Sequence, residues 1–323
     1  MKKILAVYSI CGLSGRENTP YYIDSVRSLL NQTVAEKWGA DFQVAVSGCV
    51  TSDGTQAALQ SVFHDKISYN WFEEPIPLSV TVNATVDKCV DKFGEFEGYL
   101  YIDSGISFWD PSKRNDALEI FYSAFKRHQD GLVACMPSND DGCSWWGINY
   151  EPNKDFVLPV GKATNMHCQI FPESWRKAYN RILPDIFASN CMESVFSCMA
   201  AAIHIPYVMT QDIHVLHAHS MDGASMSARN KIPGVHNPMS SMFQTSGDLF
   251  MTTKTMDDRY MEGHEYGFGF EECTEYWRHD PSKFENGKSL DPRLKEFVAR
   301  ELYLKAEEYN YADVRQTFTP ARV

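Results

Sequence analysis

The sequence predicts an α/β protein built on a mostly parallel sheet that is flanked by helices. Over residues 4–102, short apolar runs alternate with segments whose apolar residues recur every three or four positions. The short runs are typical of buried strands, and the three-to-four spacing is typical of helices. Strands that alternate with helices predict parallel pairing, because a crossover between parallel strands needs a connection about as long as a helix.

In the first half, each element follows from a local pattern. The run ILAVYS is apolar enough to begin the sheet, and the helices at 22–34 and 81–93 repeat their apolar residues at helical spacing. Clusters of glycine, serine and proline between the segments mark turns. The expected strands are residues 4–9, 42–46, 68–72 and 99–102, and the expected helices are residues 22–34, 56–63 and 81–93.

The second half is less regular. Residues 138–152 are polar and contain glycine, which predicts a surface loop, whereas residues 192–203 are small and apolar, as in a buried helix. The remaining expected elements are helices at 116–129, 192–203 and 291–310 and strands at 131–136 and 207–219.

Composition narrows the class of protein. The chain has 30 Lys and Arg against 42 Asp and Glu. Its net charge of −12 disfavours an extended nucleic-acid-binding surface, because such a surface relies on basic side chains. No apolar segment approaches the ~20 residues that cross a bilayer, so we expect no membrane insertion and a cytoplasmic protein, in a host cytoplasm if the chain is viral. The nine cysteines are scattered, which favours a reducing compartment.

Asp103 directly follows the apolar run YLYI, at the end of an expected strand. Ligands of open α/β sheets bind beyond the carboxyl ends of strands. A lone buried carboxylate is costly, so an acid at this place needs a ligand or a local hydrogen bond. Asp103 is therefore either a ligand-binding residue or the cap of the turn that follows it.

The order of motifs over residues 4–220 resembles that of GT-A glycosyltransferases of the inverting, family-two type. That family combines an S-L-L-x-Q helix, a turn after the second strand, a helix that starts with Asn, a strand that ends in D-x-D, an acidic residue opening a late helix, and a strand that ends in His and Ser. The matching positions are 28–32, 47–55, 83, 103–105, 193 and 217–220. The chain departs from the family at Ser47 and Gly48, where two acids are usual, and at Gly105, where the second D-x-D acid is missing.

The resemblance implies a GT-A, Rossmann-like fold with a C-terminal helical extension and a nucleotide-sugar donor, by default a UDP-sugar. It implies a hexosyl- or pentosyltransferase in which Glu193 is the general base and the anomeric centre is inverted. A divalent cation, Mn²⁺ or Mg²⁺, would be held by Asp103 and His217, with His219 as the substitute. The implied donor-binding residues are Tyr8, Ser9, Ser47, Asn83, Asp103, Ser104 and Gly105.

The acceptor is left open among a saccharide, a lipid-linked glycan, a protein and a modified DNA base. Trp145 and Trp146 are adjacent in the expected loop, where they either stack on an acceptor or anchor the loop to the core. A phage-type enzyme that glycosylates hydroxymethylated pyrimidines is one alternative function. A nucleotidyltransferase and a noncatalytic nucleotide-sugar-binding protein are the others.

The domain organisation follows from the same order of motifs. We expect a catalytic domain over residues 1–220, divided into a donor-binding half at 1–105 and an acceptor-binding half at 106–220. Residues 221–323 are expected to form a C-terminal extension that supplies a lid and a helix.

Overall fold

The computed structural model describes the secondary structure of residues 2–11, 19–49, 54–73, 78–103, 105–108, 115–128, 131–137, 155–158, 168–183, 196, 199–200, 203–217, 284–285, 288–289 and 315–322. The helices are α1 (Thr19–Leu30), α2 (Thr33–Trp38), the 3₁₀ helix η3 (Gly39–Asp41), α3 (Thr55–Phe63), α4 (Leu78–Phe93), α5 (Ala117–Arg127) and α7 (Glu173–Tyr179). The strands are β1 (Lys2–Cys11), β2 (Phe42–Cys49), β3 (Ser68–Phe72), β4 (Phe96–Asp103), β5 (Ile106–Ser107), β6 (Leu132–Pro137), β7 (Phe156–Val157), β8 (Cys168–Pro172), β9 (Tyr207–His217), β10 (Phe284–Glu285), β11 (Lys288–Ser289) and β12 (Gln316–Thr319).

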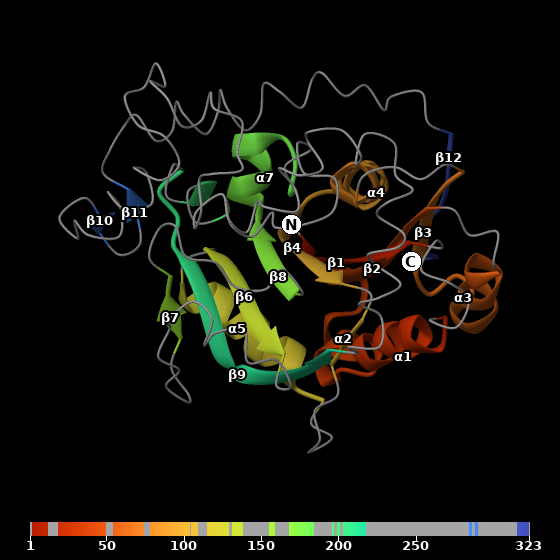
Figure 1. Cartoon of the computed structure of the whole chain (residues 1–323), viewed down its shortest axis with the longest axis horizontal. Coiled ribbons are helices and arrows are strands. Elements are labelled where there is room, and N and C mark those ends of the chain that lie inside the picture. The colour runs from red at the N-terminus through yellow and green to blue at the C-terminus, as the bar shows by residue number, and fades with distance from the viewer. Residues whose placement is uncertain are drawn as a thin grey trace, which may run out of the picture.

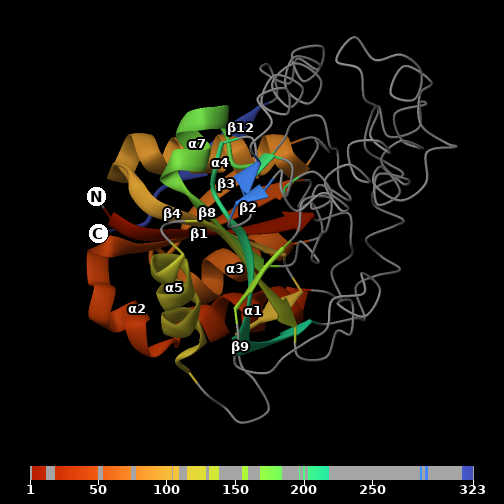
Figure 2. The same cartoon turned by 90° about the vertical axis from the view of Figure 1, so that its left-hand side faces the viewer.

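Apart from β10 and β11, which pair with each other in a separate two-stranded sheet, these elements form three layers around one sheet, as Figures 1 and 2 show. The strand order is β12-β3-β2-β1-β4-β8-β6-β9-β5, and β7 pairs with β9. Helices α4 and α7 cover one face, and α1, α2, α3 and α5 cover the other (Figures 1 and 2). The expected α/β class, with a parallel centre and flanking helices, is confirmed.

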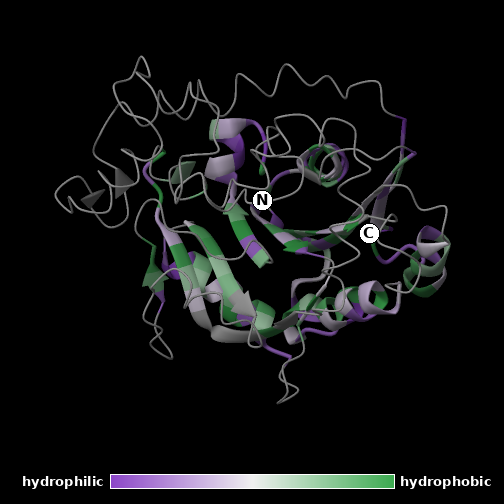
Figure 3. Ribbon diagram, viewed as in Figure 1, coloured by the Kyte–Doolittle hydropathy of each residue, from purple (hydrophilic) through white to green (hydrophobic). Residues whose placement is uncertain are grey.

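Strand β1 is at the centre of the sheet and is apolar on both faces. Its residues Ile4, Leu5, Ala6, Val7 and Tyr8 are all fully buried. Burial on both faces is the reason that the run reads as continuously apolar instead of alternating. Figure 3 shows hydrophobic residues along the central strands.

Strand β8 was not expected from the sequence. It runs antiparallel to both β4 and β6 and so interrupts the parallel order. The segment CQIFP has only five residues, and the polar Gln169 interrupts the apolar run that would otherwise predict a strand. In the structure Gln169 is buried and its Nε2 donates to the Tyr207 hydroxyl at 2.9 Å.

The expected helix at 22–34 is two helices, α1 and α2, because the chain breaks at Gln32. That residue has extended backbone angles, φ −67° and ψ 142°, and precedes the first turn of α2. Helix α4 begins at Leu78, three residues earlier than the expected helix at 81–93. The expected helix at 291–310 lies outside the described residues. In the part of the chain that the structure describes, no helix has the length and apolarity to cross a membrane.

The C-terminal strand β12 is part of the sheet of the first half of the chain. It pairs antiparallel with the edge strand β3, from Gln316 opposite Phe72 to Thr319 opposite Tyr69. Asn70 Nδ2 donates to Gln316 Oε1 at 3.0 Å, and the Ala321 amide donates to Ser68 Oγ at 3.0 Å. The expected boundary at residue 220 separates β12 from β3, the strand with which it pairs.

We predict that removing residues 315–323 lowers the free energy of unfolding by about 3 kcal/mol, because several buried hydrogen bonds of β3 lose their partners. Urea unfolding measures this loss. Gln316→Ala is the matched control, and it should lower the free energy by about 1 kcal/mol, since it removes one of these bonds. Unfolding of the shortened chain at the urea midpoint of the full chain would contradict the prediction.

Candidate functional site

A row of polar residues crosses the sheet near the carboxyl ends of its parallel strands. Ser9 is in register with Ser47 on one side and with Asp103 on the other, and Ser47 is in register with Asn70. Residues in register on neighbouring strands point to the same face. Asn70 Nδ2 donates to Thr85 Oγ1 of α4 at 3.1 Å, which identifies that face as the α4 side. Three of the expected donor-binding residues, Ser9, Ser47 and Asp103, therefore lie side by side.

Tyr8 points away from this row. Its side chain is fully buried on the opposite face, and its hydroxyl donates to the Ser25 carbonyl of α1 at 3.0 Å. Burial raises the pKa of the Tyr8 phenol well above its ordinary value, so the group stays neutral. The Tyr8 side chain is thus held inside the protein, on the face of the sheet opposite Ser9.

Gly48 shows why an acid is absent at one of the two positions where the resembled family carries one. A Cβ atom at Gly48 would overlap ring carbons of Trp71, which packs flat across the glycine backbone. No acidic side chain fits there. Ser47 Oγ is fully buried and has no hydrogen-bond partner among the residues that the structure describes. A buried hydroxyl left in this state is unfavourable.

The segment after Asp103 is held by helix α1. The Phe108 amide donates to Ser28 Oγ at 2.8 Å, and Gln32 Nε2 donates to the Phe108 carbonyl at 3.2 Å. Gln32 Oε1 also accepts from the Leu118 amide in the first turn of α5 at 3.1 Å. The S-L-L-x-Q pattern thus has a physical purpose, because its Ser and Gln hold both backbone groups of one residue close to the site.

Ser25 helps Ser28 and Gln32 to hold this segment, and we call these three residues the clasp. The sequence analysis did not identify Ser25 as a site residue. Its hydroxyl donates to the Ile106 carbonyl of β5, and it is buried on α1 together with Ser28. The signal that could have found it is its position. Ser25 and Ser28 are polar, yet they stand beside Val26 and Leu29 on the apolar side of the helix.

Strand β9 ends beside the segment that follows Asp103. Ile106, three residues after Asp103, pairs with His217, and Ser107 pairs with Leu216. The backbones that carry Asp103 and His217 are therefore neighbours, although 114 residues separate them in sequence (217 − 103). Gly105 is buried in the turn between β4 and β5. The side chain of His217 lies outside the described residues.

Asn83 has other partners than the expected donor. It is the sixth residue of α4, and its carboxamide bonds to the backbone of Ile182 and Leu183. This corrects the expectation that Asn83 opens the helix, since α4 begins at Leu78. The remaining expected site residues are outside the described part of the chain: Glu193, Ser104, His219, Trp145 and Trp146.

A divalent cation prefers oxygen ligands such as a carboxylate. Asp103 is partly exposed at the end of β4, beside the end of β9, and this place fits such an ion. Within the described ranges, no group of three His, Cys, Asp or Glu side chains is arranged to hold a metal. Asp103 is the carboxylate at this place that could hold such an ion, and further ligands would come from residues beyond those ranges.

Comparison with known proteins supports the fold. No protein-family model and no curated protein sequence matches the chain. Among solved structures, it is similar to GalNAc-T7, crystallised with UDP, GalNAc and Mn²⁺, with a TM-score of 0.50, 9% identity, and coverage of 89% of this chain and 60% of that one. It is also similar to the mannosyltransferase PcManGT from Pyrobaculum calidifontis, in complex with GDP-Man and Mn²⁺, with a TM-score of 0.49, 12% identity, and coverage of 97% and 77%. The chain has the GT-A type of fold.

We predict that Gln32→Leu lowers the free energy of unfolding by about 3 kcal/mol, because the carbonyls of Ser28 and Phe108 and the amide of Leu118 each lose a partner while the side chain keeps its volume. Gln43→Leu is the matched control: Gln43 is also buried, but its Nε2 makes a single bond, to the Ala40 carbonyl at 3.2 Å. Urea unfolding of both variants tests the clasp. An equal loss in the two variants would show that Gln32 has no special role.

Proposed function

We propose that the chain is a glycosyltransferase that moves a sugar from a nucleotide-sugar donor to an acceptor hydroxyl. The observation that carries the proposal is the in-register placement of Asp103 beside Ser9 and Ser47, next to the strand end that carries His217. The GT-A type of fold supports it, since it is shared with GalNAc-T7.

The donor's leaving group is a nucleoside diphosphate, which concentrates negative charge. A divalent cation, Mn²⁺ or Mg²⁺, would neutralise that charge during departure. In our proposal Asp103 and His217 hold the cation, and His219 is the substitute for His217. Ser9, Ser47, Ser104 and Gly105 would contact the donor. The Ser47 hydroxyl has no hydrogen-bond partner among the residues that the structure describes. UDP is the proposed carrier, as in the resembled family.

Glu193 is the proposed general base. It would take the proton of the acceptor hydroxyl while that oxygen attacks the anomeric carbon from the side opposite the leaving group. A single displacement of this kind inverts the anomeric centre. Trp145 and Trp146 are proposed to stack on the acceptor.

Thermal unfolding in the presence of nucleotide sugars, with and without Mn²⁺, tests the proposal. A ligand that binds only the folded state at a concentration 100 times its Kd adds about 2.7 kcal/mol to the free energy of unfolding. Turnover of the ligand that binds should release a nucleoside diphosphate. Release of pyrophosphate would instead identify a nucleotidyltransferase, and binding without turnover would identify a noncatalytic protein.

We predict that Asp103→Asn weakens donor binding at least about tenfold in Mn²⁺, because a neutral amide is a poor ligand for a hard cation. Titration calorimetry with the nucleotide sugar measures the Kd. The same titration without metal is the control, and there the variant should match the wild type. Equal weakening with and without Mn²⁺ would mean that Asp103 contacts the ribose instead of the metal.

We predict that Glu193→Gln lowers kcat by about 100-fold or more, because the amide cannot accept the acceptor's proton. The donor Kd should stay unchanged, since the proposed base does not touch the nucleotide. Release of nucleoside diphosphate in the presence of acceptor measures kcat. A variant that keeps the wild-type rate would show that another residue is the base.

A further inference from the structure

The turn after Asp103 leads into a very short strand. Strand β5 consists of Ile106 and Ser107, and it is the last strand in the order of the sheet, where it pairs with the end of β9. A pairing of two strands is marginal by itself in water. The position of β5 therefore depends on contacts with the layer that packs against it, and helix α1 makes such contacts.

The clasp holds the backbone on the far side of β5. Ser28 Oγ accepts from the Phe108 amide at 2.8 Å and donates to the Ser25 carbonyl at 2.6 Å. Gln32 Nε2 donates to the Phe108 carbonyl at 3.2 Å. Ser28, Gln32 and Phe108 are all buried, so a lost hydrogen bond here is not replaced by one to bulk water. Both polar backbone groups of Phe108 thus depend on side chains of the clasp.

Tyr8 connects the clasp to the centre of the sheet. Its hydroxyl donates to the Ser25 carbonyl at 3.0 Å, so this one carbonyl accepts from both Tyr8 and Ser28. Tyr8 is in register with Ile102, the residue that precedes Asp103. The clasp is therefore joined to β1 beside the end of β4, and it is also joined to the backbone that follows the turn.

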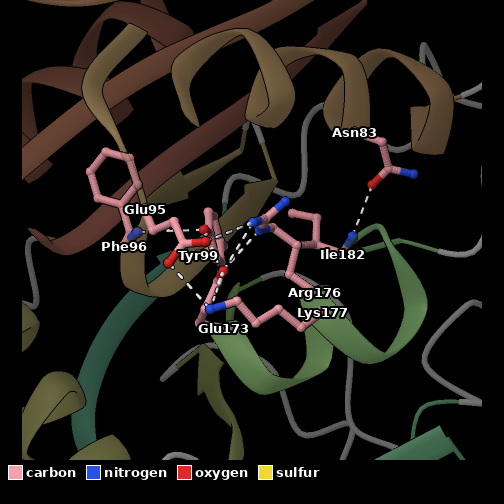
Figure 4. Close-up of polar contacts among 8 residues, drawn as sticks. All are labelled: Asn83, Glu95, Phe96, Tyr99, Glu173, Arg176, Lys177 and Ile182. Carbon is pink, nitrogen blue, oxygen red and sulfur yellow. Dashed lines mark hydrogen bonds and ion pairs between the residues drawn. The ribbon is translucent and has the colours of Figure 1, made fainter. Parts of the chain in front are cut away.

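A separate network holds the first half of β4 (Figure 4). The Tyr99 hydroxyl donates to Glu173 of α7 at 2.6 Å, and Glu173 also accepts from Arg176 through two bonds of 2.9 Å. Burial by itself would raise the pKa of Glu173, but the bonds from Arg176 and Tyr99 lower it, so the carboxylate stays ionised. This network can be weakened at Tyr99 while every bond of the clasp stays in place.

We propose that the clasp positions the backbone that carries the ligands of the divalent cation. Asp103 is three residues before Ile106, and His217 lies opposite Ile106 on β9, so the backbones of both proposed ligands meet at β5. By fixing Phe108, the clasp fixes β5 and through it the spacing of these two backbones. The clasp residues thus act on the cation through its ligands and do not touch it. The inference rests on the proposed function.

Ser28→Ala tests the proposal, because it removes the acceptor of the Phe108 amide. We expect the Kd of Mn²⁺, titrated in the presence of UDP, to rise at least about tenfold, since groups that orient metal ligands contribute about 10- to 100-fold to metal affinity. The Kd of UDP without metal should match that of the wild type, because α1 covers the face of the sheet opposite Ser47. If Ser28→Ala does not fold, Ser25→Ala replaces it, since the Ser25 hydroxyl donates to the Ile106 carbonyl.

Ser68→Ala is the matched control. Ser68 is also a fully buried serine, and its Oγ accepts from the Ala321 amide at 3.0 Å on strand β3, which β2 and β1 separate from β4. Tyr99→Phe is a second control, which weakens the attachment of β4 itself away from the turn. Both controls should lower the melting temperature, as Ser28→Ala does, and leave the Kd of Mn²⁺ at the wild-type value.

Hydrogen exchange gives a readout that depends on neither turnover nor metal. Ser28→Ala should speed exchange of the Leu216 and His217 amides at least about tenfold, because the end of β9 loses the support of β5, whereas the two controls should not. Unchanged exchange there, or a rise in the Kd of Mn²⁺ no larger than in the controls, would overturn the proposal. If exchange speeds up as expected but the wild-type protein binds neither Mn²⁺ nor a nucleotide sugar, the clasp holds β5 and the proposed function is wrong, and the positioning role is then wrong with it.

Discussion

The rest of the structure depends on the parallel register of β1 with β2 and β4. Side chains alternate between the two faces of a strand, so a shift of one residue would move Ser9, Ser47 or Asp103 to the opposite face. In this register Ile4 through Tyr8 are all fully buried between the two helical layers. The pairing of the mostly apolar strand β1 with β2 and β4 thus determines where Ser9, Ser47 and Asp103 lie.

The helices that cover the sheet also hold irregular backbone near the site. On one face, Ser25 and Ser28 of α1 and Gln32, which caps α2, hold the segment after Asp103. On the other face, α4 uses Asn83 to hold Ile182 and Leu183. Segments outside helices and strands must find partners for their buried amides and carbonyls. Side-chain amides serve well because they donate and accept at once.

Gly48 and Ser47 stand where the resembled family usually carries two acids. The structure gives a steric explanation at Gly48 and shows an electrostatic consequence at Ser47. Trp71 occupies the space above Gly48, which excludes an acid there whatever the ligand. Ser47 replaces a charge with a neutral hydroxyl that is buried without a partner in the described part of the chain. A neutral group at this place lacks the negative charge that an acid would carry there.

The sequence by itself determined the α/β class, most of the elements of the first half and the position of Asp103 at a strand end. These features depend on local periodicity and on apolar runs that only a buried strand explains. It could not show the antiparallel strand β8, whose five residues have no period, or the break at Gln32, whose amide is needed elsewhere.

Only the tertiary structure decided which polar residues meet. The side chains of Tyr8 and Asn83 were expected at the site, and in the structure they form hydrogen bonds to the protein's own backbone. Ser25 was not expected there, and its hydroxyl bonds to the segment after Asp103. It also decided that the last strand of the chain, β12, completes the sheet beside β3 and that the end of β9 returns beside Asp103. Hydrogen-bond partners a hundred or more residues apart are set by the packing of layers, and a local pattern carries no information about that packing.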